Sequence, residues 1–174
     1  AYGFIGGLME HVNEITAVTN PLVNSYKRLM SGYEAPRYAA WSDRNRSSLL
    51  RIPSAGGFNT RIELRSPDGE ANPYLTLALV IAAGMDGIRR NLTPPAAVDV
   101  NLGDLSPAQI RAGNIAQLPR SLGEALDLFE NSSFTREILG NHIVEKFARE
   151  KRREWDAYSL QVSDWELEQY LPRF

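Results

Sequence analysis

Two short runs of alternating apolar residues around a double glycine constrain this chain more than any other feature. The first run covers residues 44–53 and the second covers residues 61–68, with Gly56 and Gly57 between them. A period of two with a glycine-containing connection is typical of two antiparallel strands joined as a hairpin. Because strand side chains alternate between the two faces, one face of the second run carries three charged residues: Arg61, Glu63 and Arg65.

The charges of this hairpin predict a surface that binds an anion. All of its cations are arginines, and they outnumber the carboxylates Asp43, Glu63 and Asp68; they are Arg44, Arg46, Arg51, Arg61 and Arg65. Guanidinium groups match the oxygens of carboxylates and phosphates with paired hydrogen bonds. A carboxylate among them can hold a hard cation such as Mg²⁺, which often bridges protein carboxylate and substrate phosphate. The alternative interpretation is a solvated strand face covered by surface ion pairs.

Helical periodicity accounts for most of the remaining chain. A first helix is predicted over residues 4–18, and His11 within it is interpreted as structural, because no second histidine follows four positions later. Asn72 is a natural N-cap with Pro73 at the first helical position, so a helix is predicted from there to about Arg89. This helix is apolar around much of its circumference and is expected to pack behind the hairpin. Further helices are predicted after Ser106, after Ser121 and from Phe134 to about Leu160.

These elements predict one α+β domain over residues 1–174. Antiparallel hairpin strands are backed by helices, residues 37–42 are a candidate additional strand, and the C-terminal half is helical. A chain of 174 residues is long enough to bury a single core of ordinary size.

Composition excludes several classes of function. The net charge is −2, and no basic run is flanked by stacking aromatic residues, so no nucleic-acid partner is expected. The longest apolar run, residues 74–85, is too short to span a bilayer, so no membrane role is expected. The chain contains no cysteine, which removes thiolate chemistry and suits a reducing, cytoplasmic location.

Several motifs together resemble type I glutamine synthetase. They occur in the order and near the spacing of that family, and they extend over the whole chain. They are Asn20-Pro21, residues 24–29, residues 32–36, residues 44–47, residues 51–53, Arg61-x-Glu63-x-Arg65, residues 72–75 and the terminal Trp165, Glu166 and Tyr170. The resemblance covers the C-terminal part of the family's catalytic domain.

The resemblance implies an activity and a set of site residues. Glutamine synthetases join ammonia to L-glutamate, with ATP first phosphorylating the side-chain carboxylate to γ-glutamyl phosphate. The matching motifs imply that Arg28 and Arg65 bind glutamate, that Arg46, Arg51 and Arg61 bind ATP, and that Glu63 holds one Mg²⁺ or Mn²⁺. Glu34 would also contact glutamate, and it would be the catalytic residue on a flap that closes over that substrate. Other copies of the parent enzyme, as a dodecamer, are the expected partners.

Two positions depart from the family pattern. The loop Ser54–Thr60 contains no basic residue, so any contact of this loop with ATP falls to backbone groups. Gly103 stands where regulated members carry a tyrosine that is adenylylated, so that modification is not expected here.

The chain is expected to be inactive alone, because the remaining metal ligands of the family lie outside it. Two further interpretations stay open. One is a γ-glutamyl-amine (polyamine) ligase of the same superfamily, and the other is a non-catalytic assembly or regulatory domain.

Overall fold

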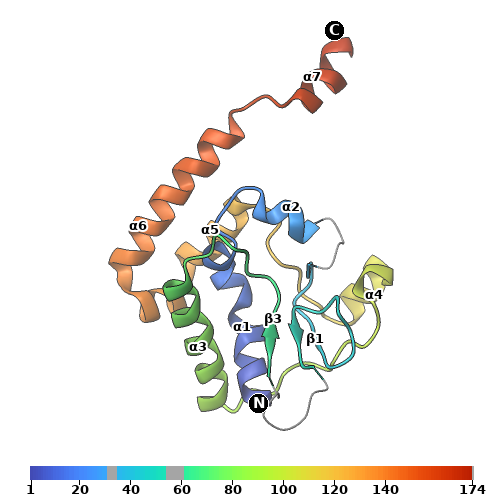
Figure 1. The fold of residues 1–174 in the computed structure, drawn as a ribbon, viewed down its shortest axis with the longest axis vertical. Helices are drawn as coiled ribbons and strands as arrows, with labels where there is room; N and C mark the ends of the chain where they lie inside the picture. Colours follow the sequence, from blue (N-terminus) through green and yellow to red (C-terminus); the bar gives the residue numbers. More distant parts are fainter. Residues whose placement is uncertain (31–34, 54–60, 174) are drawn as a thin grey trace.

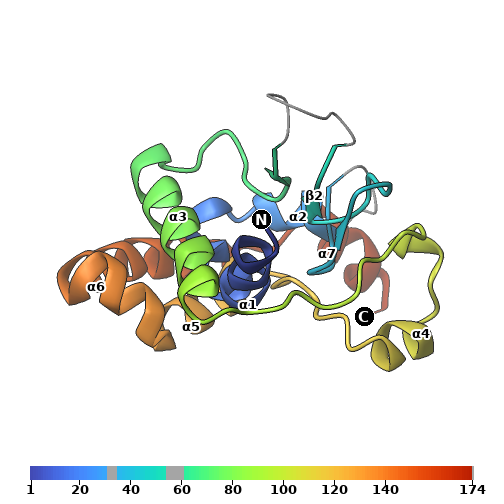
Figure 2. The ribbon, with the colours of Figure 1, turned by 90° about the horizontal axis from the view of Figure 1, so that it is seen from below.

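The computed structural model describes residues 1–30, 35–53 and 61–173. Figures 1 and 2 show α1 lying between α3 and a small sheet, and Figure 1 shows α7 apart from the body, beyond the end of α6. In chain order the elements are α1 (Tyr2–Thr19), α2 (Ser25–Met30), β1 (Trp41–Ser42), β2 (Leu50–Arg51), β3 (Glu63–Leu64), α3 (Pro73–Arg89), η2 (Leu102–Asp104), α4 (Pro107–Ala112), α5 (Leu122–Asn131), α6 (Ser133–Ser159), α7 (Asp164–Tyr170) and η3 (Leu171–Arg173). The mixed α+β class predicted from the sequence is confirmed.

The sheet has the order β1-β2-β3. Strands β2 and β3 pair antiparallel, with Leu50 opposite Leu64 and Arg51 opposite Glu63, which confirms the predicted pairing of the two runs. Strand β1 falls in the candidate strand at residues 37–42, but it pairs with β2 in parallel. This parallel pair was not part of the expected antiparallel sheet.

Side chains explain how so short a connection can join two parallel strands, which usually need a dozen residues or more between them. In the loop 43–49, Ser42 Oγ accepts hydrogen bonds from the backbone N–H groups of Arg44 (3.0 Å) and Asn45 (2.9 Å). Asn45 Oδ1 accepts from the backbone N–H and the hydroxyl of Ser47, both at 2.8 Å. The Asn45 amide also donates to the carbonyl of Val100. These bonds turn the chain back within seven residues.

The predicted helix starts agree with the structure. Asn72 caps α3, its side chain accepting from the N–H groups of Tyr74 and Leu75 at 3.0 and 3.2 Å, and Ser121 caps α5. Helix α6 begins at Ser133 and is interrupted at Gly140, whose φ of 78° is a left-handed conformation that glycine adopts without strain.

Helix α3 packs chiefly on α1, which separates it from the sheet. The contact is a seam of glycines: a Cβ on Gly7 would lie 2.0 Å from the Ala83 carbonyl oxygen, and one on Gly87 would lie 2.1 Å from the Gly3 carbonyl oxygen. The inward face of α3 carries Ala83, Gly84 and Gly87 together with Leu79, and all four are buried. Other large apolar side chains of this helix are exposed; they are Tyr74, Leu77, Ile81, Met85 and Ile88.

The core lies between α1, α5 and the strands. Leu49 and Leu50 are fully buried against it, as are Tyr26 of α2 and Phe129 of α5. Within the described part of the chain, no helix has the length and apolar character needed to cross a membrane.

His11 joins three helices, in agreement with its structural interpretation. Its ring is buried, with Nδ1 3.1 Å from Glu14 Oε2 and Nε2 2.9 Å from Asp86 Oδ2 of α3. The ring stacks on Phe134 of α6 with a centroid separation of 3.9 Å. Hydrogen bonding by His11, followed by that of Arg90, lowers the pKa of Asp86 despite an opposing effect of burial.

Candidate active site

Glu63 is the carboxylate at the centre of the arginine-rich sheet edge. Strand β3 places it opposite Arg51, whose Nη1 lies 3.3 Å from Glu63 Oε2. Arg61, two residues earlier on the same side of the chain, approaches the other oxygen, with Nη2 2.7 Å and Nε 2.9 Å from Oε1. The alternation predicted for this strand therefore brings the two guanidinium groups to opposite sides of one carboxylate.

These contacts determine the protonation of Glu63. Burial alone would raise the pKa of its carboxyl group, but the hydrogen bonds and positive charges of Arg61 and Arg51 outweigh burial and lower the pKa below its ordinary value. Glu63 is therefore ionised at neutral pH. The side chain remains 27% exposed, so it is accessible to a ligand.

A divalent cation fits Glu63 only as one ligand among several. An ionised carboxylate is the donor that Mg²⁺ and Mn²⁺ prefer. Within residues 1–30, 35–53 and 61–173, no group of three or more His, Cys, Asp or Glu side chains converges as a metal site. A metal site with three or more such ligands would therefore need side chains from outside these residues.

The two arginines predicted to bind glutamate are linked through the backbone at the end of β3. Arg65 donates its backbone N–H to the Leu49 carbonyl at 3.0 Å, and its Nη1 lies 3.4 Å from the Ser48 carbonyl oxygen. Arg28, on α2, donates to the carbonyl of Ser66, the residue after Arg65, and to that of Pro67 at 3.3 Å. Their sequence separation is 37 positions, yet they share one short segment of backbone.

The other predicted site residues are less connected. Arg46 is exposed in the loop 43–49, and no hydrogen bond or ion pair joins it to the described residues. Glu34, the predicted catalytic residue, and the loop Ser54–Thr60 lie outside the described residues.

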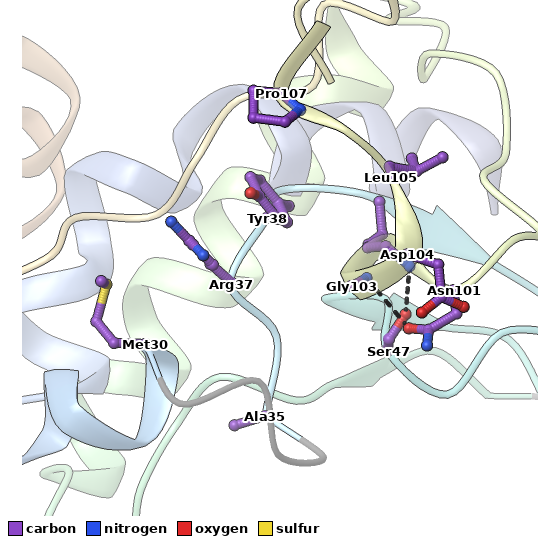
Figure 3. A pocket seen from close by; sticks show the side chains of 11 residues that line it. Met30, Ala35, Arg37, Tyr38, Ser47, Asn101, Gly103, Asp104, Leu105 and Pro107 are labelled. Carbon is purple, nitrogen blue, oxygen red and sulfur yellow. Dashed lines mark hydrogen bonds between the residues drawn. The ribbon is translucent and has the colours of Figure 1, made fainter. Parts of the chain in front are cut away.

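A cavity of about 570 Å³ lies between the segment that precedes β1 and residues 101–107 (Figure 3). Arg37 Nε is buried there without a hydrogen-bond partner among the described residues, and its guanidinium group lies 5.3 Å from the centre of the Tyr38 ring. On the other wall, Ser47 Oγ accepts from the backbone N–H of Leu102 at 3.2 Å, and Gly103 contributes to the lining. No sequence motif marked Arg37 or Tyr38. Only their position directly after the Gly32–Pro36 motif could have drawn attention to them.

Comparisons with known proteins place this geometry in a family. The model of the glutamine synthetase catalytic domain matches residues 1–170. The glutamine synthetase of Clostridium saccharobutylicum is 47% identical over 174 residues, covering 100% of this chain and 39% of the relative. That of Methanosarcina mazei is 49% identical over 168 residues, covering 97% of this chain and 38% of the relative.

Solved structures agree in fold. A structure described as apo GmaS without ligand superposes with a TM-score of 0.82 at 39% identity, and a GmaS/ADP complex superposes with 0.84 at 38%. Each comparison covers 98% of this chain and 38 or 39% of the other. The chain spans about two-fifths of the length of the relatives it matches. With its catalytic-domain match, its identity to these enzymes and its shared fold, the chain belongs to the glutamine synthetase family, as part of the catalytic domain.

Proposed function

We propose that this chain supplies part of the active site of a ligase that joins ammonia to L-glutamate, using ATP and passing through γ-glutamyl phosphate. The observation that carries the proposal is the ionised Glu63 held between Arg51 and Arg61 on adjacent strands. Two guanidinium groups and a carboxylate in this order suit a phosphate group and the cation that accompanies it. That GmaS, a neighbour in fold, has been solved with ADP supports the use of a nucleotide.

Phosphoryl transfer needs positioned groups and neutralised charge more than covalent help from the protein. We assign the ATP phosphates to Arg46, Arg51 and Arg61. Glu63 holds one Mg²⁺ or Mn²⁺, which when bound supplies positive charge to the phosphate oxygens.

The glutamate substrate is assigned to the residues around the end of β3. Arg28 and Arg65 orient its charged groups, because Arg28 donates to the carbonyl of Ser66, the residue that directly follows Arg65. We assign to Glu34 the removal of a proton from the incoming ammonium ion and the shielding of the phosphorylated intermediate from water.

The enzyme that contains this chain is proposed to be a cytoplasmic oligomer, a dodecamer in its full-length form, as membership of the glutamine synthetase family implies. A polyamine-accepting γ-glutamyl-amine ligase remains the alternative activity. It uses the same glutamate and ATP residues, so the two differ in which amine is consumed.

The test uses a chimera, in which the length missing from this chain is supplied by the Clostridium saccharobutylicum relative. The chimera should make glutamine from glutamate, ammonia and ATP, whereas the 174-residue chain alone should make none. Glu63→Ala should abolish nearly all activity and weaken the dependence on Mg²⁺ or Mn²⁺, because it removes the carboxylate placed between the two arginines. Glu70→Ala is the matched control, since Glu70 is exposed in the turn that follows.

Three outcomes would contradict the proposal. They are an assembled chimera without ligase activity, a chimera that consumes polyamines in preference to ammonia, and a Glu63→Ala chimera with normal activity and metal dependence. Assembly is checked by gel filtration beside the unmodified relative, so that a misfolded chimera is recognised before its activity is interpreted.

A further inference from the structure

Residues 66–68, which we call the post-β3 segment, are held by the junction between α1 and α2. This segment directly follows Arg65 and lies outside the strands of the sheet, so its position depends on contacts with other parts of the chain. Ser66 is 1% exposed, and a buried carbonyl needs a donor from within the protein. The donors come from residues 19–28, more than 35 positions earlier in the chain.

Asn20 makes the most buried of these contacts. It is fully buried at the C-terminal end of α1, and its Nδ2 donates to the Ser66 carbonyl at 2.7 Å. Its Oδ1 accepts from the Thr19 hydroxyl at 2.8 Å, so the orientation of the amide is fixed. Beside it, the backbone N–H of Asp68 donates to the Thr19 carbonyl at 3.1 Å. The end of α1 therefore holds both ends of the post-β3 segment.

Helix α2 approaches the same segment. Ser25 donates its hydroxyl to Asp68 Oδ2 and accepts from the Leu22 backbone N–H at 3.1 Å. Arg28 donates to the Ser66 carbonyl, which is the oxygen that Asn20 also contacts. One carbonyl oxygen thus joins a buried amide, the arginine of α2 and the residue next to Arg65.

We infer that Asn20 is a positioning residue for the glutamate-binding arginines: its amide fixes the Ser66 carbonyl and so sets the distance between Arg28 and Arg65. The link to glutamate in this inference rests on the proposed function, whereas the contacts of Asn20 are independent of it. Within the described part of the chain, the side-chain hydrogen bonds of Asn20 go to Thr19 and Ser66 rather than to Arg51, Arg61 or Glu63, so its effect should be confined to the glutamate side of the site. A small displacement of groups that orient a substrate can lower the rate strongly.

The test variant is Asn20→Asp, which keeps the size of the side chain and the acceptor for Thr19 but replaces the Nδ2 donor by an oxygen. Asn13→Asp is the matched control, since Asn13 lies on the same helix and its amide donates to the Gln117 carbonyl at 3.4 Å, away from the post-β3 segment. Ser25→Ala is a second, milder variant that loosens the same segment from α2, and it keeps the test open if Asn20→Asp fails to fold.

In the chimera, Asn20→Asp should raise KM for glutamate on the order of tenfold or more, with KM for ATP nearly unchanged. Ser25→Ala should raise the same constant to a smaller extent, and Asn13→Asp should change neither. If Asn20 had only a structural role, its replacement would lower the amount of active enzyme without changing KM for glutamate more than KM for ATP. Equal changes in both KM values, or none, in Asn20→Asp and Ser25→Ala would overturn the inference.

A second measurement uses the 174-residue chain and needs no enzyme activity. Asn20→Asp should accelerate hydrogen exchange at the Asp68 amide and shift the NMR signal of the Arg28 guanidinium group, while Asn13→Asp leaves both as in the wild type. If the wild-type chimera makes no glutamine, the proposed function fails, but these signals still decide whether Asn20 positions Arg28. Unchanged signals in Asn20→Asp would refute that.

Discussion

Replacing Gly7 by alanine should destabilise the fold, although alanine favours helices. The added Cβ would lie 2.0 Å from the Ala83 carbonyl oxygen and 2.7 Å from the Gly87 nitrogen. Both are backbone atoms of α3, so no side chain can move aside and the two helices have to separate by roughly 1 Å. Overpacking of this kind costs about 1–3 kcal/mol, and a contact with backbone lies at the upper end or beyond. Helix propensity returns about 1 kcal/mol.

The net loss is therefore about 2 kcal/mol, which for a chain of this size lowers Tm by roughly 4–8 °C. Thermal unfolding followed by circular dichroism, with urea titration as a second measure, tests this value. Gly69→Ala is the control, because a Cβ there meets nothing within 4 Å, and its Tm should stay close to that of the wild type. A Gly7→Ala chain that melts at or above the wild-type temperature would refute the close approach of α1 and α3.

Two further predictions concern single carboxylates. The pKa of Asp86 is lowered in the folded chain, so its stabilising contribution is present above the ordinary aspartate pKa of about 3.9 and is lost as the pH falls through the lower folded value. Between roughly pH 5 and pH 2, the free energy of unfolding measured by urea titration should therefore fall less for Asp86→Asn than for the wild type. An equal fall would contradict the role of the contacts of Asp86 with His11 and Arg90. Glu34→Ala in the chimera should lower turnover strongly while leaving the affinity for Mg²⁺ and ATP nearly unchanged; calorimetry showing a loss of metal binding as large as that of Glu63→Ala would make Glu34 a metal ligand instead.

Local patterns predicted the parts of the fold that depend on neighbouring residues. The antiparallel pairing of the two short runs follows from their alternation and the glycines between them, and the cap at Asn72 follows from the residues beside it. The parallel pairing of β1 was not predictable, because it depends on hydrogen bonds from Ser42 and Asn45 within the connecting loop. Alternation of side chains does not predict whether a third strand pairs in parallel or antiparallel.

The sequence also did not predict which face of α3 packs against α1. Periodicity identifies a buried face only where apolar residues lie on one side of a helix. This helix is apolar around much of its surface, so Leu77 and Ile81 did not indicate which side is buried. The buried side is marked by Gly84 and Gly87 instead, and a glycine indicates close packing only once its partner helix is known.

The candidate site was predicted in its residue types but not in its connections. Arg28 and Arg65 could be named by resemblance, and Glu63 by its place between arginines. That Asn20 and Arg28 share the Ser66 carbonyl is a contact across 46 and 38 positions, which no local pattern encodes. The assigned roles of these residues remain predictions for the experiments above.

The position of Arg46 depends on the number of residues in the loop 43–49, which joins β1 to β2. Surface loops usually accept an added or deleted residue at small thermodynamic cost, but here nearly every second position is bound: Ser42, Asn45 and Ser47 hold the turn, and Ser47 also accepts from Leu102. One inserted residue would break this sequence of bonds and rotate Arg46 away from its place while leaving the core intact. Enzymes built on this sheet are therefore free to vary the chemistry of the loop more readily than its length.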